Sequence, residues 1–532
     1  MVLTRVLDAI TAVATLSLRL MAILFTRFHP LGKRYLNRIY GGCALYAVSQ
    51  VARLLLPNSR RASRQHHPWL LLLLGWVDRS SPFTSLATVL LNILSLGSVW
   101  DFIYRGSVLH QSHDLSFSRM GYVDESTARV VVRAPALRTN YVKISWAPSE
   151  EDGQVAAKSQ TIVIADSNDH TGTFLLEGLE PDKPYTYTTN ASHAGSFRTA
   201  ALSPKRWSLI STSCIKPFYP YNPLDHGLRI KGLEYLDRHV SANQPDMMLF
   251  LGDFIYIDLP VALGWTPEHY TTAYRQVYAS PSWSPALRSV PWLHVYDDHE
   301  IINDWAANET GLYQSAMRPY WSYQGHANPP SQYGVGKTHY TFRRGDVSFF
   351  VLDTRRYRSA ENMADGPEKT MLGAVQLADL RVWLETEKSW KVVVSSVPFT
   401  RNWRGPDSAD SWSGYLWERD MILEMMRQTD GVIILSGDRH EHATTIFPPT
   451  SDKGGKSVIE FSTSPLNQFY EPFDRFHRQI EDTDVSVYSH PWGNSKFGRV
   501  LFDTSEEGRW TVDYELIVDG RQVWNYTWEF TR

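Results

Sequence analysis

Residue types that bind metal ions follow several short apolar stretches of this 532-residue chain. Asp253 comes directly after one stretch, Asp298 and His299 follow a second, and Asp438 and His440 follow a third. Carboxylates and imidazoles are common ligands of metal ions in proteins. Any one of these residues alone has an ordinary structural explanation as a turn residue or a core histidine. Their recurrence after successive apolar stretches indicates a shared functional site.

The elements that must position these side chains are predicted from about residue 205 onward. Continuous apolar strands that alternate with helical stretches favour a layered α/β core. In such sheets, functional groups gather just past the carboxyl ends of the strands. The predicted strands are 208–213, 247–251, 292–296, 347–352, 391–395 and 431–435, with helices at 227–240 and 374–388.

Two further β regions are predicted on either side of this core. Residues 115–199 contain short β-branched and aromatic runs, and a turn there leads into Tyr185-Thr-Tyr187. This pattern predicts a small sandwich of the fibronectin type III kind, which would act as a spacer or cover one wall of the site. At the other end, 509–518 and 522–530 flank Asp519-Gly520 and predict a closing hairpin.

The first hundred residues predict membrane helices. Segments 9–25 and 40–56 are each apolar except for one arginine, and 82–100 has no charge and is about long enough to span a bilayer. A cleaved signal peptide would explain only the first segment, and a buried helical subdomain is the alternative. We predict an integral membrane protein with two or three spans. A fourth is left open by 69–77, which is too short to span alone.

Three domains are therefore expected: membrane-anchoring helices at 1–110, a β-sandwich at 111–202 and a catalytic domain at 203–532. Basic residues follow both of the first two apolar segments, so the positive-inside rule leaves the orientation open. A formal net charge of −3 gives no reason to expect nucleic acid as the main partner. Only two cysteines are present, which excludes a disulfide framework, and Cys214 taken alone suggests packing.

Three motifs resemble the PhoD-like alkaline phosphatases and phosphodiesterases, a branch of the calcineurin-like metallophosphoesterases. The resemblance extends from about Arg129 to the C-terminus and leaves out the apolar segments. Its motifs are Leu-Gly-Asp253-Phe-Ile-Tyr256, Tyr-Asp297-Asp298-His299-Glu300 and Ser-Gly-Asp438-Arg-His440, supported by Ser-Cys214-Ile-Lys-Pro and Asp353-Thr-Arg355-Arg-Tyr.

The resemblance implies a centre of two metal ions with Asp253 bridging them. Thiolate and phenolate ligands suit Fe³⁺, and an oxygen-only second site suits Ca²⁺, with Mg²⁺, Mn²⁺ or Zn²⁺ as alternatives. The chain has Ser395-Ser396 where the wider superfamily has a histidine, which leaves the second ion fewer ligands, and His442 has no assigned role. The implied ligands are Cys214, Asp253, Tyr256, Asp298, Asp438 and His440.

The expected reaction is hydrolysis by a metal-bound hydroxide, because metal binding lowers the pKa of water to about 7. His299 would protonate the leaving group. Arg355, or else Arg439, would bind phosphoryl oxygens as a planar fork, although a structural ion pair is nearly as good an explanation of Arg355.

We therefore predict a membrane-anchored phosphoesterase that hydrolyses phosphomonoesters, phosphodiesters or both. Membrane attachment makes lipid-linked phosphates candidate substrates. The alternative is a membrane-tethered interaction protein that keeps the fold with little catalytic activity. Transport by the apolar segments is a weaker hypothesis, since so few spans rarely build a pathway.

Overall fold

The computed structural model describes residues 2–55, 67–78, 80–149, 157–405, 407–449, 455–470 and 476–531. The chain forms two compact units. The first, called the helical unit here, comprises Met1–Gln111, Phe218–Gly227 and Leu259–Ala262. The second unit comprises Ser112–Pro217, Leu228–Asp258 and Leu263–Arg532.

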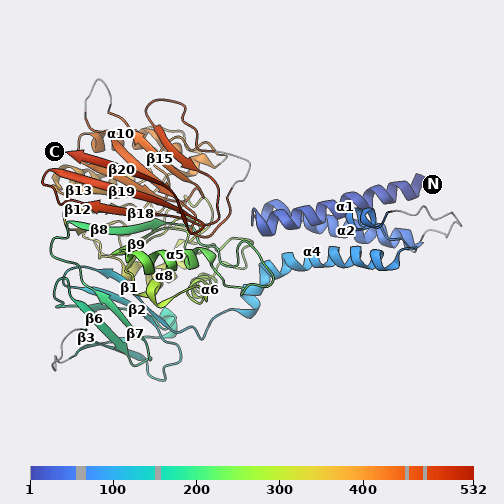
Figure 1. Ribbon diagram of the computed structural model, residues 1–532, viewed down its shortest axis with the longest axis horizontal. Helices are drawn as coiled ribbons and strands as arrows, with labels where there is room; N and C mark the ends of the chain where they lie inside the picture. Colours follow the sequence, from blue (N-terminus) through green and yellow to red (C-terminus); the bar gives the residue numbers. More distant parts are fainter. Residues whose placement is uncertain are drawn as a thin grey trace. The chain divides into compact units, whose positions relative to one another are not determined.

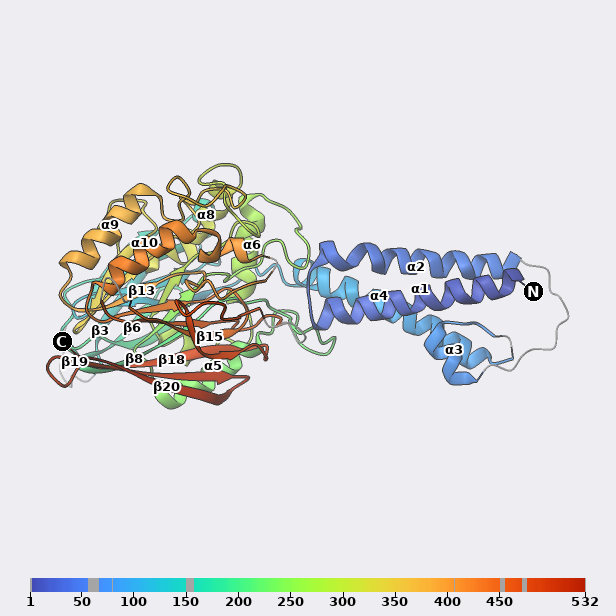
Figure 2. The same cartoon turned by 90° about the horizontal axis from the view of Figure 1, so that it is seen from above.

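Three long helices run alongside one another in the helical unit, with a short helix beside them (Figures 1 and 2). Gly42 allows α1 and α2 to pack closely, because a Cβ atom there would lie 3.0 Å from the carbonyl oxygen of Ala14. Helix α4 packs on α1 through the edge-on rings of Phe25 and Phe102. The helices are α1 (Val2–Arg27), α2 (Gly32–Leu55), α3 (Pro68–Leu74) and α4 (Pro82–Leu109).

Two of these helices could cross a membrane by length and composition, namely Leu3–Arg27 of α1 and Pro82–Leu109 of α4. A signal sequence or the core helix of a soluble protein shares these properties. Helix α2 is less apolar, with a basic start. Helix α3 has only seven residues and ends at Gly75 in a left-handed conformation, so the 69–77 segment is indeed too short to span.

The second unit begins with a β-sandwich, as the sequence predicts. Its two sheets have the strand orders β1-β2-β5 and β4-β3-β6-β7. Side chains such as Trp146, Phe174 and Tyr185 fill the space between them. The strands are β1 (Phe117–Val123), β2 (Ala128–Arg133), β3 (Tyr141–Pro148), β4 (Lys158–Val163), β5 (Thr171–Leu176), β6 (Pro184–Thr189) and β7 (Ala194–Arg198).

Two larger sheets follow, and together with their helices they confirm the predicted layered α/β core. One sheet has the order β10-β9-β8-β18-β19-β20 and the other β11-β12-β13-β14-β16-β15-β17. Their strands are β8 (Arg206–Thr212), β9 (Met247–Leu251), β10 (Trp292–Val295), β11 (Tyr340–Arg344), β12 (Val347–Val351), β13 (Trp390–Val394), β14 (Val432–Ser436), β15 (His442–Phe447), β16 (Val458–Thr463), β17 (Val485–His490), β18 (Lys496–Asp503), β19 (Arg509–Val518) and β20 (Arg521–Thr531).

The two sheets pack face to face around one apolar core, and helices cover the outer face of each. Helices α9 and α10 pack on the sheet that contains β12 to β14 (Figure 2). The other four pack on the sheet that contains β8 to β10. The helices are α5 (Lys231–Asn243), α6 (Pro267–Tyr278), α7 (Pro285–Ser289), α8 (Tyr313–Tyr323), α9 (Gly373–Thr386) and α10 (Leu416–Arg427).

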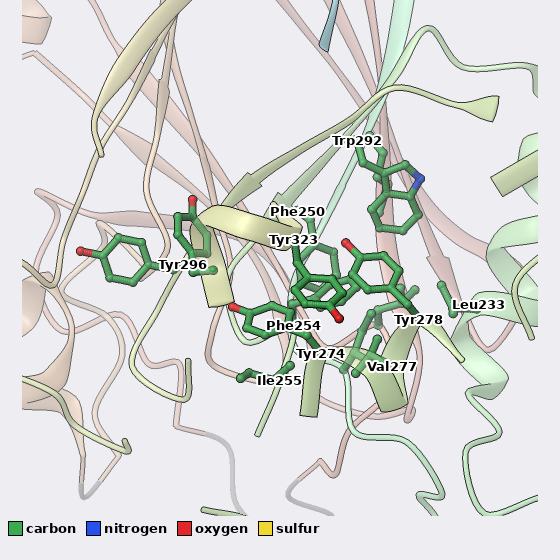
Figure 3. Close-up of a cluster of buried hydrophobic side chains, with 14 of the residues drawn as sticks. Leu233, Phe250, Phe254, Ile255, Tyr274, Val277, Tyr278, Trp292, Tyr296 and Tyr323 are labelled. Atoms are coloured by element: carbon green, nitrogen blue, oxygen red, sulfur yellow. The ribbon is translucent and has the colours of Figure 1, made fainter. Parts of the chain in front are cut away.

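One part of this core anchors the loop that carries Asp253. Phe254, the next residue, lies among the rings of Tyr274 and Tyr278 from α6 and Tyr323 from α8 (Figure 3). The ring centroids of Phe254 and Tyr278 are 4.9 Å apart. Burying such large aromatic side chains contributes strongly to stability, so the position of Asp253 is fixed by packing.

Candidate metal centre

Sharp turns after three strands, β8, β9 and β14, carry residues of the candidate centre. Cys214, Asp253, Asp438 and His440 all have positive φ angles, between 56° and 74°. This left-handed conformation is uncommon for residues other than glycine, and such strain of order 1–3 kcal/mol per residue clusters at functional sites. The surrounding sheets therefore hold these four residues in conformations that they would not adopt by themselves.

The first group of side chains combines a thiol, a carboxyl, a phenol and an imidazole. Ligand atoms of Cys214, Asp253 and His440 all lie within 4.8 Å of one another. Cys214 Sγ is 3.4 Å from Asp253 Oδ2, and the Tyr256 hydroxyl donates a hydrogen bond to the same oxygen at 2.9 Å. The Tyr256 hydroxyl is also 3.1 Å from His440 Nε2. All four predicted side chains of this group therefore converge.

The second group consists of carboxylates. Oxygens of Asp253, Asp297, Asp298 and Asp438 lie within 4.8 Å of one another. Asp253 belongs to both groups, as a bridging ligand must. Asp297 was absent from the predicted ligand set, because the resemblance assigned only the second aspartate of the Asp-Asp-His-Glu motif.

The buried acidic groups of the centre would be stabilised in their ionised forms by nearby positive charge. Burial raises the pKa of Asp253 and of Asp438 well above the ordinary range, and the neighbouring aspartates raise both further. Burial also raises the pKa of the Cys214 thiol and the Tyr256 phenol. Bound cations would remove this penalty by favouring the deprotonated ligands.

Two buried carboxylate oxygens of the candidate centre, Asp298 Oδ1 and Asp438 Oδ2, accept no hydrogen bond from the described residues. An arginine nitrogen lies near each, Arg355 Nη2 at 3.3 Å from the first and Arg439 Nε at 2.8 Å from the second. Unsatisfied buried oxygens together with a donor set of sulfur, nitrogen and oxygen fit a pair of metal ions.

His299 is held beside the centre by a carboxylate that the sequence did not point to. Its Nδ1 lies 2.6 Å from Asp258 Oδ1, and Asp258 Oδ2 accepts a hydrogen bond from the backbone N–H of Asn303. Burial by itself would lower the pKa of His299, but Asp258, Asp298 and Asp253 together raise it well above its ordinary value. These carboxylates therefore favour the protonated form of the imidazole.

Arg355 lies in an ion-pair network behind the centre. Its side chain is fully buried, and Nη2 lies 3.0 Å from Asp297 Oδ2 and 2.9 Å from Asp410 Oδ2. Arg358 pairs with the same Asp410 at 2.6 Å. This geometry agrees with the structural ion pair that the sequence left open for Arg355. Asp410, which the sequence analysis did not single out, is the shared acceptor.

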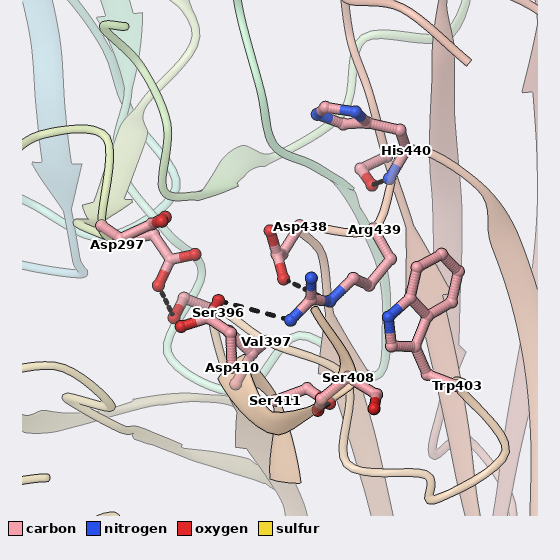
Figure 4. Close-up of polar contacts among 12 residues, drawn as sticks. Asp297, Ser396, Val397, Trp403, Ser408, Asp410, Ser411, Asp438, Arg439 and His440 are labelled. Carbon is pink, nitrogen blue, oxygen red and sulfur yellow. Dashed lines mark hydrogen bonds and ion pairs between the residues drawn. The ribbon is translucent and has the colours of Figure 1, made fainter. Parts of the chain in front are cut away.

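Arg439 is the less enclosed of the two candidate arginines. Its Nη2 is 3.3 Å from Asp410 Oδ2, and its guanidinium lies 5.5 Å from the ring centre of Trp403 (Figure 4). Ser396, which stands where the wider superfamily has a histidine, donates a hydrogen bond to Asp297 Oδ1 at 2.7 Å (Figure 4). This serine therefore positions an acidic side chain of the centre.

Glu300 fixes the two acidic loops relative to each other. Its buried carboxylate accepts backbone hydrogen bonds from Asp253 at 2.9 Å, Phe254 at 2.6 Å and Asp297 at 2.7 Å. Burial raises the pKa of Glu300 to about 8. His442, by contrast, is buried in the core, where it bonds Thr463 and stacks on Tyr514.

Comparisons with known proteins identify a family for this chain. The model of the PhoD-like phosphatase family matches residues 231–514. Alkaline phosphatase D of Bacillus subtilis (strain 168) is 25% identical over 360 residues, covering 56% of this chain and 58% of the relative. The chain thus spans less than two thirds of that relative's length.

Solved structures share the fold. A structure of PhoD superposes with a TM-score of 0.61 at 19% identity, covering 78% of this chain and 89% of the other. Purple acid phosphatase PPD1 from yellow lupin (Lupinus luteus) seeds gives a TM-score of 0.54 at 14% identity, covering 77% and 73%. These likenesses confirm the predicted metallophosphoesterase-like architecture.

Proposed function

The chain belongs to the PhoD-like phosphatase family, whose model matches more than half of it, and on this premise we propose that it is a two-metal phosphoesterase. It hydrolyses phosphomonoesters, phosphodiesters or both. One observation carries the proposal: the thiol, phenol, imidazole and carboxylates of six predicted residues converge, with Asp253 common to both groups.

The first metal position is formed by Cys214, Tyr256 and His440, which suit Fe³⁺. The second is formed by Asp298 and Asp438, which suit Ca²⁺, with Mg²⁺, Mn²⁺ or Zn²⁺ as alternatives. Asp253 is shared between them. Asp297 is a further carboxylate of the second position, although Arg355 holds it in an ion pair.

Two bound cations would supply a water-derived nucleophile at neutral pH and would compensate charge on the phosphoryl oxygens. The chain's own residues supply the rest. Asp258 orients the imidazole of His299 through the 2.6 Å contact to Nδ1. The protonated ring then donates its proton to the departing oxygen of the ester, as a general acid does.

We assign the contact with the phosphoryl oxygens to Arg439, whereas the sequence-based prediction favoured Arg355. Arg355 positions Asp297 and Asp298 from behind the centre, because its guanidinium is buried among carboxylates. Arg439 is the better candidate for a contact with the phosphoryl oxygens, since it lies directly beside Asp438 and is slightly exposed.

We also propose that the helical unit anchors the protein in a membrane, so that lipid-linked phosphates are among its candidate substrates. Large apolar side chains along α1 and α4 are exposed to the surroundings, including Val13, Leu20, Phe83 and Leu94. Exposure of so many large apolar residues is costly in water and favourable in lipid.

Purified full-length protein tests the function with p-nitrophenyl phosphate, bis(p-nitrophenyl) phosphate and the corresponding alkyl esters. We expect metal-dependent hydrolysis of at least one class. His299→Gln should slow alkyl esters about 10²- to 10⁴-fold, because an alkoxide needs a proton, and nitrophenyl esters much less.

Asp166→Asn is the control, because that side chain is exposed and lies between β4 and β5 of the β-sandwich. A metal-loaded protein that hydrolyses none of the four esters would support the interaction-protein alternative. Equal losses for alkyl and nitrophenyl esters in His299→Gln would remove the general-acid role.

A further inference from the structure

We propose that the helical unit binds the headgroups of anionic phospholipids through a cationic collar, defined here as Arg27, Lys33, Arg34 and Arg38. The collar surrounds the turn between α1 and α2. This inference goes beyond ester hydrolysis, and it rests on the membrane anchoring proposed above.

An exposed apolar band defines where the hydrocarbon would lie. On α1 the band extends from Leu3 to Ile23, which is about 30 Å at the helical rise of about 1.5 Å per residue. That length matches the hydrocarbon thickness of a bilayer. Its exposed members on the three long helices are Leu3, Val6, Ile10, Val13, Leu16, Leu20, Ile23, Leu45, Val48, Val51, Phe83, Leu86, Leu90, Leu91, Ile93 and Leu94.

Aromatic side chains mark the end of the band nearest the collar. Tyr40 on α2 and Trp100 and Tyr104 on α4 are all exposed. Tyr and Trp gather at the two membrane–water interfaces, because one end of each ring system is apolar and the other is polar. These three residues therefore predict the level at which hydrocarbon gives way to headgroups.

The collar lies just beyond this level. Lys33, Arg34 and Arg38 are exposed on the first two turns of α2, before the exposed large aliphatic residues of the same helix, which begin at Leu45. Arg27 is the last residue of α1 and is also exposed. Cations at this depth attract the phosphates of anionic lipids.

The collar cations are not neutralised by the protein. Among the described residues, no carboxylate forms an ion pair with any of the four, and α2 contains no acidic residue. Two other arginines of the helical unit are neutralised, since Arg53 pairs with Asp8 and Arg105 pairs with Asp101. Four cations without a carboxylate partner are thus gathered within residues 27–38, around the turn between α1 and α2.

Two segments from later in the chain lie at the collar end of the helical unit. The backbone N–H of Gly32 donates a hydrogen bond to Pro260 O at 3.0 Å, and Arg27 Nη1 donates one to Tyr221 O at 2.7 Å. A Cβ atom on Gly32 would lie 2.2 Å from Pro260 O, so this contact requires glycine.

Native mass spectrometry of the full-length protein in nonionic detergent tests the collar, with phosphatidylglycerol and phosphatidylcholine as the two probes. We expect retained phosphatidylglycerol to exceed phosphatidylcholine. The triple variant K33Q/R34Q/R38Q should weaken phosphatidylglycerol binding by roughly 100-fold, since each cation contributes about fivefold. Metal content and melting temperature report whether the variant folds. If it does not, the single variants K33Q and R38Q should each lose about fivefold.

The matched control is R60Q/R61Q/R64Q, which removes the same charge from the sequence that follows the carboxyl end of α2. It should keep phosphatidylglycerol binding. Equal losses in both triple variants, or equal retention of the two lipids by the unmodified protein, would overturn the collar.

Alkaline carbonate extraction of membranes separates this inference from the anchoring on which it rests. Release of the unmodified chain into the soluble fraction would refute the anchoring and the collar together. Retention in the membrane, combined with unchanged phosphatidylglycerol binding by K33Q/R34Q/R38Q, would refute the collar alone.

Discussion

The polar cluster around Arg19 in the helical unit and the candidate metal centre differ in whether their polar groups find hydrogen-bond partners within the protein. In the helical unit, Arg19 Nε donates to Asn92 Oδ1 at 2.7 Å, and Nη2 donates to the carbonyl and hydroxyl oxygens of Thr88, both at 3.0 Å. Its Nη1 bonds the carbonyl of Leu72. In the candidate metal centre, by contrast, carboxylates such as Asp253 and Asp298 face one another.

The difference separates a structural role from a binding role. The cluster around Arg19 joins α1, α3 and α4 with donors matched to acceptors, so it needs no further partner. Crowded carboxylates repel one another and raise each other's pKa, and strained loops hold them in place. A buried group of this second kind is stabilised when a cation binds.

The largest effect is expected from Asp253→Asn. Loss of the shared ligand should lower ester hydrolysis by at least about 10³-fold, because catalytic groups that act as a unit fail together. The same change should raise the melting temperature of the metal-free protein, since it removes one of the crowded negative charges. Hydrolysis assays and thermal unfolding with and without chelator measure the two effects.

Asp166→Asn again serves as the control and should change neither quantity. A metal-free Asp253→Asn protein that melts below the metal-free parent would contradict the electrostatic reading of the centre. Near-normal turnover by this variant would contradict its catalytic role.

The ion-pair network of Arg355 has matched charges, so removing its arginine should destabilise the fold, whereas Asp253→Asn should stabilise the metal-free protein. Arg355→Met removes the partner of Asp297 and Asp410, and we expect a loss of about 3–5 kcal/mol in the free energy of unfolding. Arg343→Met is the control, because that side chain is 57% exposed and its pair with Glu387 contributes at most about 1 kcal/mol. Denaturant titrations measure both losses. Similar small losses in the two variants would indicate that Arg355 acts on substrate instead.

The buried carboxyl of Glu460 should make the free energy of unfolding depend on pH. Burial raises the pKa of Glu460 from 4.5 to about 7 in the folded protein, although Ser436 and two backbone N–H groups donate to it. Between these values the folded state keeps a proton that the unfolded state releases. Stability should therefore fall as pH rises from about 4.5 to 7, by on the order of 3 kcal/mol.

Glu460→Gln should remove this contribution to the pH dependence, whereas Glu385→Gln, an exposed glutamate on α9, should leave it in place. Denaturant titrations at several pH values between 4.5 and 8 provide the comparison. An unchanged pH slope in Glu460→Gln would show that the carboxyl ionises normally.

The smallest effect is expected from the helical unit. Arg19→Leu should cost this unit about 1–2 kcal/mol, the usual contribution of polar contacts between membrane helices. Metal content and turnover should not change. Detergent-induced unfolding followed by circular dichroism measures the loss, with the exposed Arg5→Leu as the control. Loss of metal from Arg19→Leu would mean that the two clusters are coupled.

Most of the candidate ligands could be recognised in the sequence because they follow a short apolar strand. Cys214, Asp253 and Asp438 lie immediately after β8, β9 and β14, so a local pattern carried the information. The same analysis missed Asp258 and Asp410, which lie in loops with no such pattern and reach the site only through tertiary folding.

The burial of Arg355 and the pairing of β18 could not be predicted for a similar reason. Strand β18 pairs with β8 in antiparallel register, for example Val500 with Leu209, although nearly three hundred residues separate them. No local periodicity records such a partner. In the sequence, Arg355 is compatible with a phosphoryl contact or with a structural ion pair, and only the positions of Asp297 and Asp410 in the fold show what surrounds it.

Elemental analysis of the purified full-length protein shows whether the candidate centre holds metal ions. We expect about two metal ions per chain, one of them iron, and a clear loss of metal in Asp253→Asn with the fold retained. A folded, active protein without bound metal, or an Asp253→Asn variant with undiminished metal content, would contradict this expectation.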